Sequence, residues 1–531
     1  MNDEFIELRS DNKTSSQIDD SIRIGIFLIL FVLSCIPIFL TPVIPTVDYY
    51  DHINRYYVLS NINSNNFLEE NYVENWSVLP NIVLDVIGVQ LLNYVSPELS
   101  SKVVIILIFL VQYTGILFFS RSISGKLSWI TGLLAIPLLY SFVFSWGFAN
   151  FLLGLGLAMW GGALWLTLRD RLILATFVGV VTAITVFLTH GLAFALYGLL
   201  LGGLELGFFW ARHRDWRVLF SRLALLALQA IAPVLLFLVS ATVGSGNGVT
   251  NAADAVSRLA MEGKLTSRLV EIAQYRVQTL FRVAEGPSPW FDAVTFTATV
   301  LLVGLLVRRG CVTIPKVVWP ALLIAAVLVL ITPPAMFGVG YVADRMPLFL
   351  AFLVVGSLTL RGIPRSVDMA IIGALVLLVV GRISWIAYDW RGYAQDFESY
   401  SAVASKIPPQ KVVAYINVNL ESRLVSSRRC EMYGPLLISL YGQASPLFAI
   451  PTAQPLRLTG RLLAGLSHLP QHERFTVPEE RAYHNAVLAK IAEERHFDYV
   501  LLCDAARLQR GFPAGAVVVA ARDRFTLLKV R

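Results

Sequence analysis

The residues best suited to chemistry lie together just after the first apolar segment. Asp48, Asp51, His52 and Arg55 fall within the short run 46–57. If residues 51–60 form a helix, Asp51 and Arg55 lie one turn apart on the same face, with His52 beside them. A carboxylate at the edge of a low-dielectric bilayer, near a cation, is suited to general-base catalysis. We expect Asp48 to be the base; the structural alternative is that one aspartate, with Asp51 the better candidate, caps the following helix.

The apolar segments that must position these residues predict a polytopic α-helical membrane protein. Hydrophobic residues make up 56% of the 531-residue chain, and about eleven stretches are long enough to cross a bilayer. Lys and Arg gather at alternate junctions, so the positive-inside rule predicts a cytoplasmic N-terminus. This explains the net charge of +7 without a nucleic-acid partner. The predicted helices are 22–44, 102–119, 127–145, 147–168, 171–189, 191–210, 218–240, 293–307, 317–333, 346–361 and 366–387.

Outside the membrane, the same pattern predicts two external loops and an external tail. The first loop, 45–101, contains the apolar run 79–89, which Asp85 interrupts, and we expect an interfacial or partly buried helix there. The middle loop, 241–292, carries apolar residues at helical spacing with arginines between them, which predicts amphipathic helices on the membrane face. The chain therefore divides into a cytoplasmic tail (1–21), a transmembrane domain (22–387) and an external α/β domain (388–531).

The external domain is predicted from a change in composition after Ile386. At about 140 residues it is large enough to bury a core of its own. Its cysteines, Cys430 and Cys503, either pair in an oxidising compartment or stay as two buried thiols, and the sequence leaves both open. Apolar runs predict strands at 412–416, 499–502, 516–519 and 525–528, and a helix is predicted at 479–496.

Cations on the predicted external side are candidates for binding an anionic substrate. Arg345 lies in a short hairpin, 341–347, whereas most external hairpins here have no cation. The functional interpretation is a phosphate clamp, and the alternatives are a local pair with Asp344 or an anchor to lipid headgroups. His190 ends a predicted membrane helix, where an ionisable group is a functional hint, although a hydrogen-bonded interfacial histidine is equally compatible. The remaining substrate-binding candidates are Arg55, Asp85, Arg276 and Arg282.

The layout resembles the GT-C superfamily of polytopic membrane glycosyltransferases. The match in motif is Asp48-Tyr49-Tyr50-Asp51-His52 at the start of the first external loop, and the match in architecture covers the whole chain. The adjacent acidic pair common in that superfamily is here replaced by Asp-x-x-Asp-His. The resemblance implies a polyprenyl-phosphate-linked sugar donor, a glycan or lipid acceptor of the cell envelope, and an inverting reaction at the external face of the inner (plasma) membrane. A base, with Asp48, Asp51 and His52 as candidates, would deprotonate the acceptor hydroxyl.

Other function classes are less compatible with the sequence. No Walker-type phosphate loop and no zinc-type Cys/His spacing occur. A divalent metal held by Asp48 and Asp51 is possible, but two acids without a clear third ligand make a poor cage. The alternatives to a glycosyltransferase are a non-catalytic transporter or flippase of lipid-linked saccharide and an inactive subunit of an envelope-polymer assembly. A transporter should show matched, interrupted helices at mid-membrane, and the sequence shows none.

Overall fold

The computed structural model divides the chain into two compact units. It describes residues 15–211, 214–240, 265–286, 288–336, 340–360, 365–418, 430–447, 454–467, 469, 477–508 and 511–530. The first unit contains residues 1–36, 106–144 and 149–385, and the second contains residues 37–105, 145–148 and 386–531. The predicted domain boundary at 387/388 therefore falls close to the last division between the units, but the second unit also includes the predicted first external loop.

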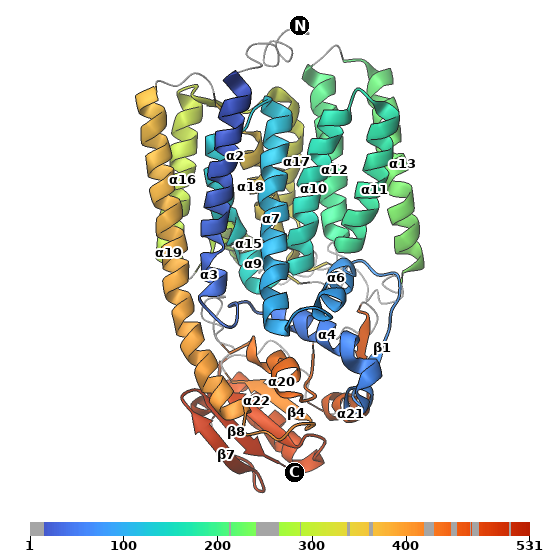
Figure 1. Cartoon of the computed structure of the whole chain (residues 1–531), viewed down its shortest axis with the longest axis vertical. Coiled ribbons are helices and arrows are strands. Elements are labelled where there is room, and N and C mark those ends of the chain that lie inside the picture. The colour runs from blue at the N-terminus through green and yellow to red at the C-terminus, as the bar shows by residue number, and fades with distance from the viewer. Residues whose placement is uncertain are drawn as a thin grey trace. The chain divides into compact units, whose positions relative to one another are not determined.

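Most long helices of the first unit are apolar and have roughly parallel axes (Figure 1). Two helices, α7 (Pro97–Ser124) and α19 (Arg365–Ala404), contribute residues to both units. Short β2 (Val312–Thr313) and β3 (Thr359–Leu360) pair antiparallel. The other long helices of this unit are α2 (Ser15–Ser34), α8 (Trp129–Leu139), α10 (Ala149–Leu168), α11 (Leu172–Thr189), α12 (Gly191–Ala211), α13 (Trp216–Val239), α15 (Leu265–Phe281), α16 (Pro289–Arg308), α17 (Trp319–Ile331) and α18 (Val342–Ser357).

Eight helices among the described residues are long and apolar enough to cross a membrane, which identifies a helical membrane protein. Shorter apolar helices lie at Arg23–Phe39, Val83–Leu92 and Lys316–Ile331. A helix overlaps each of the eleven predicted spans, and the total of eleven crossings stays a prediction. The eight are Pro97–Ser124, Trp129–Trp146, Ala149–Leu168, Leu172–Thr189, Gly191–Ala211, Trp216–Val239, Pro289–Arg308 and Met369–Ala404.

Several predicted helices have different ends in the structure. The predicted helix 22–44 stops at Ser34 and resumes as α3 (Ile36–Phe39), since Pro37 has no amide hydrogen to continue the helical pattern. The predicted helix 127–145 is interrupted between α8 and α9 (Phe142–Trp146), shortly after Pro137. The last predicted helix, 366–387, continues as α19 for 40 residues to Ala404. The first break lies just before Pro37 and the second just after Pro137, and a proline removes one backbone hydrogen bond of a helix.

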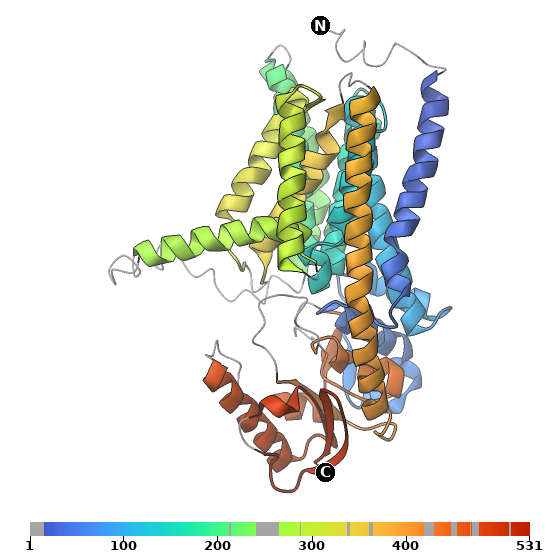
Figure 2. The same cartoon turned by 90° about the vertical axis from the view of Figure 1, so that its left-hand side faces the viewer.

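The middle loop contains a helix that lies across the others. Figure 2 shows α15 roughly perpendicular to α16. Apolar Val270, Ile272 and Val277 are exposed on α15, as expected for a predicted amphipathic helix at a membrane face. Residues 241–264, including the rest of the predicted amphipathic region, lie outside the described residues. The short η3 helix (Arg282–Ala284) follows α15 directly and begins the return to α16.

Close helix packing in the first unit depends on glycine. A Cβ on Gly203 of α12 would lie 2.6 Å from the Cα of Ala321 in α17. Gly207, one turn later, faces the backbone of Val317 in the η4 helix (Lys316–Val318). Small residues spaced four apart let helix backbones approach closely in membranes, so α12 approaches the backbone of α17 at Gly203 and that of η4 at Gly207.

The second unit combines the first loop with the tail. Its helix α4 (Tyr49–Asn61) packs against α6 (Val83–Leu92) and α20 (Tyr433–Tyr441). The predicted interfacial run 79–89 thus becomes α6, which begins and ends a few residues later. The remaining elements are η1 (Ile62–Ser64), α5 (Asn66–Glu69), β1 (Tyr72–Glu74), β4 (Val413–Asn417), β5 (Leu456–Leu458), α21 (Gly460–Ser467), α22 (Val477–Glu494), β6 (Tyr499–Cys503), η6 (Ala505–Arg507), β7 (Val517–Arg522) and β8 (Phe525–Lys529).

The sheet of the second unit has four strands in the order β4-β6-β8-β7. β4 and β6 are parallel, with Val413 opposite Tyr499, while β6–β8 and β8–β7 are antiparallel. Every residue of β6 is buried, which explains why this strand is a continuous apolar run rather than an alternating one. All four strands and α22 were predicted from the sequence to within a few residues.

The core of the tail is shared with the first loop. One cluster of buried side chains contains Val58, Leu59 and Tyr72 from the loop together with Val412 and Val500 from the tail. The pairing of β1 with β5 joins the same two segments through antiparallel backbone hydrogen bonds. The tail therefore shares its core with the first loop, and independent folding of residues 388–531 stays a prediction.

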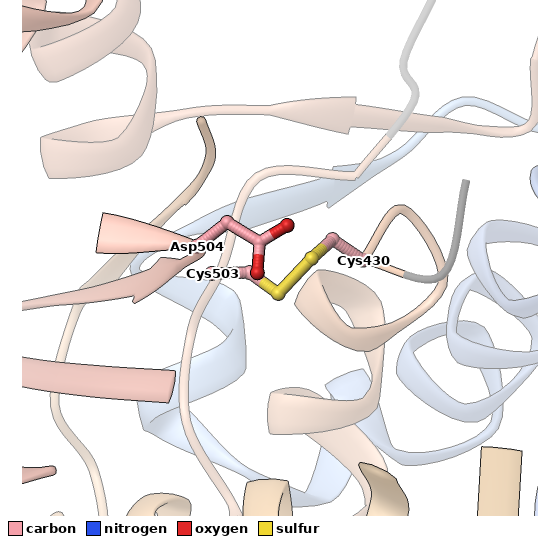
Figure 3. A group of neighbouring side chains, drawn as sticks. All are labelled: Cys430, Cys503 and Asp504. Atoms are coloured by element: carbon pink, nitrogen blue, oxygen red, sulfur yellow. A yellow bond between two sulfur atoms is a disulfide. The ribbon is translucent and has the colours of Figure 1, made fainter. Parts of the chain in front are cut away.

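The two cysteines of the tail form a disulfide. Cys430 and Cys503 are joined between the start of the α20 segment and the end of β6 (Figure 3). The Asp504 carboxylate lies beside them. Because both sulfurs are in the disulfide, neither is a thiolate able to bind a metal ion. The sequence left pairing open, and the structure shows the pair.

Candidate functional site

Asp48 stands at the N-cap position of α4 without acting as its cap. Its backbone is in the right-handed helical region, and its side chain makes no capping hydrogen bond. Asp51 lies in the first turn of the helix rather than at the cap. The expectation that Asp51 is the cap is therefore wrong. Both side chains are half-buried, so each carboxylate is within reach of a molecule at the surface of this unit.

The backbone at Asp48 is fixed by a tight hairpin. The amide of Val47 donates to the carbonyl of Ser145 (3.1 Å), and the amide of Asp48 donates to the carbonyl of Trp146 (2.8 Å). Gly147 follows at φ +96°, and a Cβ there would lie 2.5 Å from the nitrogen of Tyr49. Only glycine fits that conformation and that contact. The hairpin thus holds the residue that begins α4 at a set position.

Arg55 is held inside the second unit by three side chains. Its Nε donates to Asp85 Oδ1 (2.6 Å), and one terminal nitrogen donates to Gln454 Oε1 (3.0 Å). The other terminal nitrogen lies 2.9 Å from His52 Nδ1. Arg55 is 3% exposed and Asp85 is 0% exposed. Arg55 thus forms a buried ion pair with Asp85, and the substrate-binding roles of Arg55 and Asp85 stay predictions.

His52 is the accessible end of this network. The ring is half-buried, while its partner Arg55 is fully enclosed. Burial and the adjacent positive charge of Arg55 lower the pKa of His52 well below its ordinary value. His52 is therefore neutral at physiological pH. Gln454 in the tail gave no sequence signal, because its contact joins segments far apart in the chain.

Two polar atoms beside the Arg55–Asp85 pair have no hydrogen-bond partner among the described residues. They are Asp85 Oδ2 and the hydroxyl of Tyr56, and both residues are fully buried. Tyr56 packs so closely on α6 that a Cβ on Gly88 would collide with its ring. A buried polar atom without a hydrogen-bond partner lowers the stability of the fold by about 1–3 kcal/mol. The packing of the surrounding side chains must offset that cost to keep Tyr56 and Asp85 in place.

A second cluster lies in the first unit, around Arg345 at the start of α18. One terminal nitrogen of Arg345 lies 3.3 Å from His190 Nε2, and the other donates to the carbonyl of Gly340 (3.4 Å). The amide of Leu192 donates to His190 Nδ1 (3.1 Å). The guanidinium also lies over the ring of Phe151, 5.5 Å from its centroid. The structure thus brings Arg345 and His190 together, as two of the predicted substrate-binding residues.

Both ring nitrogens of His190 face N–H donors. A neutral imidazole has one acceptor nitrogen. The Leu192 amide has a fixed hydrogen at the first turn of α12, so we assign Nδ1 as the acceptor and place the ring proton on Nε2. The Nε2–H then lies beside the Arg345 guanidinium. N–H donors placed side by side are suited to bind an anion.

Arg282 and Arg276 lie beside this cluster. Arg282 forms an ion pair with Asp344, and its Nε lies 3.7 Å from Glu285. The hydroxyl of Tyr275 donates to the other oxygen of Asp344 (2.6 Å). Asp344 is therefore engaged by Arg282 and Tyr275 on one side of α18. For Arg276, Nε and one terminal nitrogen are buried with no acceptor among the described residues.

A buried ion pair that the sequence analysis missed holds the η3 segment. Arg382 of α19 donates to Asp292 Oδ1 (2.7 Å) and to the carbonyl of Ala284 (2.5 Å). The second oxygen of Asp292 accepts from the amide of Gly286 (2.7 Å). Arg382 lies inside an apolar predicted span, which by itself signals a paired or functional charge. A charged residue inside the apolar run 366–387 is visible in the sequence, so this ion pair had a sequence signal.

The described residues contain one cluster of three possible metal ligands, Cys430, Cys503 and Asp504, and two of these are disulfide-bonded. The cluster does not include Asp48 or Asp51. The structure therefore gives no added support to a metal held by these two aspartates.

Comparisons with known proteins concern the fold. No family model matches the chain, and no curated protein matches it in sequence. The structure is similar to the cryo-EM structure of the arabinofuranosyltransferase AftD from Mycobacteria, with 13% identity, a TM-score of 0.41 and 95% of this chain covered. The chain spans 40% of the length of that protein. It is also similar to the crystal structure of ArnT from Cupriavidus metallidurans in the apo state, with 14% identity, a TM-score of 0.41, 98% of this chain covered and 99% of that chain.

Proposed function

We propose that this chain is a membrane glycosyltransferase that uses a polyprenyl-phosphate-linked sugar. It transfers the sugar, with inversion, to a glycan or lipid acceptor at the external face of the plasma membrane. The observation that carries the proposal is the Asp48 carboxylate, which stands at the start of α4 without serving as its cap. An acid held at a fixed backbone position, half-buried and not used for capping, is suited to accept a proton.

In this mechanism Asp48 accepts the proton of the acceptor hydroxyl. The hydroxyl oxygen then bonds to C1 of the donor sugar, and the bond between C1 and the phosphate oxygen breaks. The polyprenyl phosphate leaves with the bonding electron pair. Asp51 lies about one turn of helix after Asp48 and is the second candidate for the base.

The leaving phosphate needs cationic or N–H stabilisation. The Arg345 guanidinium and the His190 ring lie side by side and support this role, because N–H donors placed together suit a phosphate oxygen. Arg276 adds two buried guanidinium nitrogens that have no acceptor among the described residues. Arg282 is already paired with Asp344, so we assign it to orienting α18 and Arg345. No metal is required in this scheme.

The experiment measures transfer by the purified full-length chain from a panel of radiolabelled polyprenyl-phosphate sugars. Asp48→Asn keeps the size of the side chain and removes the proton acceptor, so transfer should fall about 10²–10⁴-fold while folding is retained. The matched control is Asp170→Asn. Asp170 is an exposed carboxylate between α10 and α11, and its variant should transfer at the wild-type rate.

Two outcomes would contradict the proposal. If Asp48→Asn and Asp51→Asn both turn over like the wild type, neither aspartate is the base. If no donor in the panel is consumed while labelled lipid-linked sugar moves across reconstituted vesicles, the chain is a transporter.

A further inference from the structure

Arg55 fixes the proton position on His52. The guanidinium is anchored by Asp85 at Nε and by Gln454 at one terminal nitrogen. The other terminal nitrogen is therefore directed at His52 Nδ1, at 2.9 Å. A guanidinium can only donate hydrogen bonds, since all of its nitrogens carry protons and none has an available lone pair. His52 Nδ1 must then be the acceptor and carry no proton.

A neutral imidazole with a bare Nδ1 has its proton on Nε2. A second proton on the ring would point at the guanidinium and place two positive groups in contact, so the ring stays neutral. The ionisable groups around it are Asp51 on the same helix, Asp85 on α6, and Tyr56 beside Arg55. The charge of Asp85 is balanced by Arg55 in their ion pair. Asp51, which directly precedes His52 in the sequence, is the other carboxylate among these groups.

We propose that Asp85 and Arg55 lock His52 in the Nε2–H tautomer, so that His52 donates a hydrogen bond to a substrate hydroxyl and does not act as the proton acceptor. The second half rests on the proposed function. No described residue accepts a hydrogen bond from Nε2–H of His52. The ring is half-buried, so a bound molecule can reach it. Arg55 and Asp85 are positioning residues in this scheme, because both are enclosed and act through His52. His52 is thereby removed from the list of candidate bases.

The tautomer is tested directly by NMR on protein labelled with ¹⁵N-histidine, with His52 assigned from its loss in His52→Gln. The expected result between pH 6 and pH 8 is a protonated Nε2 and an unprotonated Nδ1. Arg55→Leu removes the donor and should give a mixture of the two neutral tautomers. Arg171→Leu is the matched control, since Arg171 is an exposed arginine at the start of α11, and it should leave the His52 signals unchanged. A proton on Nδ1, or a charged ring at pH 7, in the wild type would overturn the inference.

The donor role is tested by comparing two amides. The amide nitrogen of glutamine reaches the position of Nε2, whereas that of asparagine reaches only the position of Nδ1. His52→Gln should therefore retain most of the transfer rate, while His52→Asn and His52→Ala should lose roughly 10- to 100-fold, as expected for one lost hydrogen bond in a buried site. Equal losses in all three variants would contradict the donor role.

The two readouts separate this inference from the proposed function. The NMR result does not depend on sugar transfer, so a wrong tautomer overturns the lock and leaves the assignment of Asp48 standing. The expected tautomer in a protein that transfers no sugar would instead overturn the proposed function and leave the lock standing.

Discussion

Replacing Gly147 with alanine should displace the Asp48 backbone, because the hairpin has no room for a Cβ. In the wild type, Gly147 adopts φ +96°, and an added Cβ would lie 2.5 Å from the nitrogen of Tyr49 and 3.0 Å from that of Asp48. Real Cβ atoms do not approach backbone nitrogen so closely. The hairpin or the start of α4 must therefore move, and the two segments are joined by backbone hydrogen bonds.

The free-energy cost of Gly147→Ala has two parts, the backbone conformation and the weakened hydrogen bonds. A left-handed conformation at a non-glycine residue costs about 1–2 kcal/mol. Moving the two segments apart weakens the bonds from Val47 to Ser145 (3.1 Å) and from Asp48 to Trp146 (2.8 Å), each contributing about 1 kcal/mol. The sum is roughly 2–4 kcal/mol of local destabilisation. A displacement of about 1 Å at a catalytic group lowers turnover about 10²-fold, so transfer should fall by that order.

Hydrogen–deuterium exchange provides an assay that does not depend on activity. The amides of Val47 and Asp48 should exchange faster in Gly147→Ala, alongside the loss of turnover. Gly442→Ala is the matched control in the same unit. Gly442 also has a positive φ, +64°, but nothing lies within 4 Å of the added Cβ, so it carries the conformational cost without the contact. Unchanged exchange at Val47 and Asp48 in Gly147→Ala would refute the reasoning, as would equal losses of turnover in both variants.

Three further outcomes are expected. Arg345→Ala should weaken binding of a labelled polyprenyl-phosphate sugar and Arg345→Lys should restore it only in part, because a point charge cannot reproduce the planar fork; full binding by the alanine variant would exclude a donor role. Replacing both Cys430 and Cys503 with serine should lower the free energy of unfolding by about 4 kcal/mol for a 73-residue separation, seen as a lower thermal midpoint, and an unchanged midpoint would count against it. Burial opposes ionisation of Asp498, but hydrogen bonds from Arg461 and a backbone amide outweigh it and hold the pKa of Asp498 below its ordinary value. The stabilisation is present above the unfolded pKa near 3.9 and is lost as pH falls through the lower folded pKa. The thermal midpoint of the wild type should therefore lie above that of Asp498→Asn at pH 7, and the two midpoints should converge in acid. A difference in midpoint that persists at low pH would contradict this.

Local patterns in the sequence predict local structure well in this chain. The strand predicted at 499–502 and the helix predicted at 479–496 agree with β6 and α22 to within two residues at each end. The acidic run at Asp48 begins a helix, as predicted. In each case the deciding interactions are between residues near one another in sequence, or depend on burial of a whole segment.

Pairings between distant residues could not be read in the same way. The spacing puts Asp51 and Arg55 one turn apart, but the carboxylate that accepts a hydrogen bond from Arg55 Nε is Asp85, 30 residues away. The choice is made by the packing of α4 on α6, which encloses both Arg55 and Asp85 and leaves Asp51 half-buried. Gln454 joins the same network from 399 residues away, and no spacing rule links it to Arg55. The cap was misassigned for a related reason, because the hairpin at Gly147 sets where α4 begins.

The joining of the first loop to the tail sets an order of events during synthesis. The hydroxyl of Tyr72 donates to the carbonyl of Ser445 (2.6 Å), 373 residues further along the chain. At about 5–20 residues per second, roughly 20–75 s separate the synthesis of these two residues. During that interval β1 has no partner strand, and the apolar face of the first loop has no core to join. The segment that carries Asp48 and His52 is thus completed only when the end of the chain arrives, so a prematurely terminated chain should leave an unpaired strand edge for chaperones and proteases to recognise.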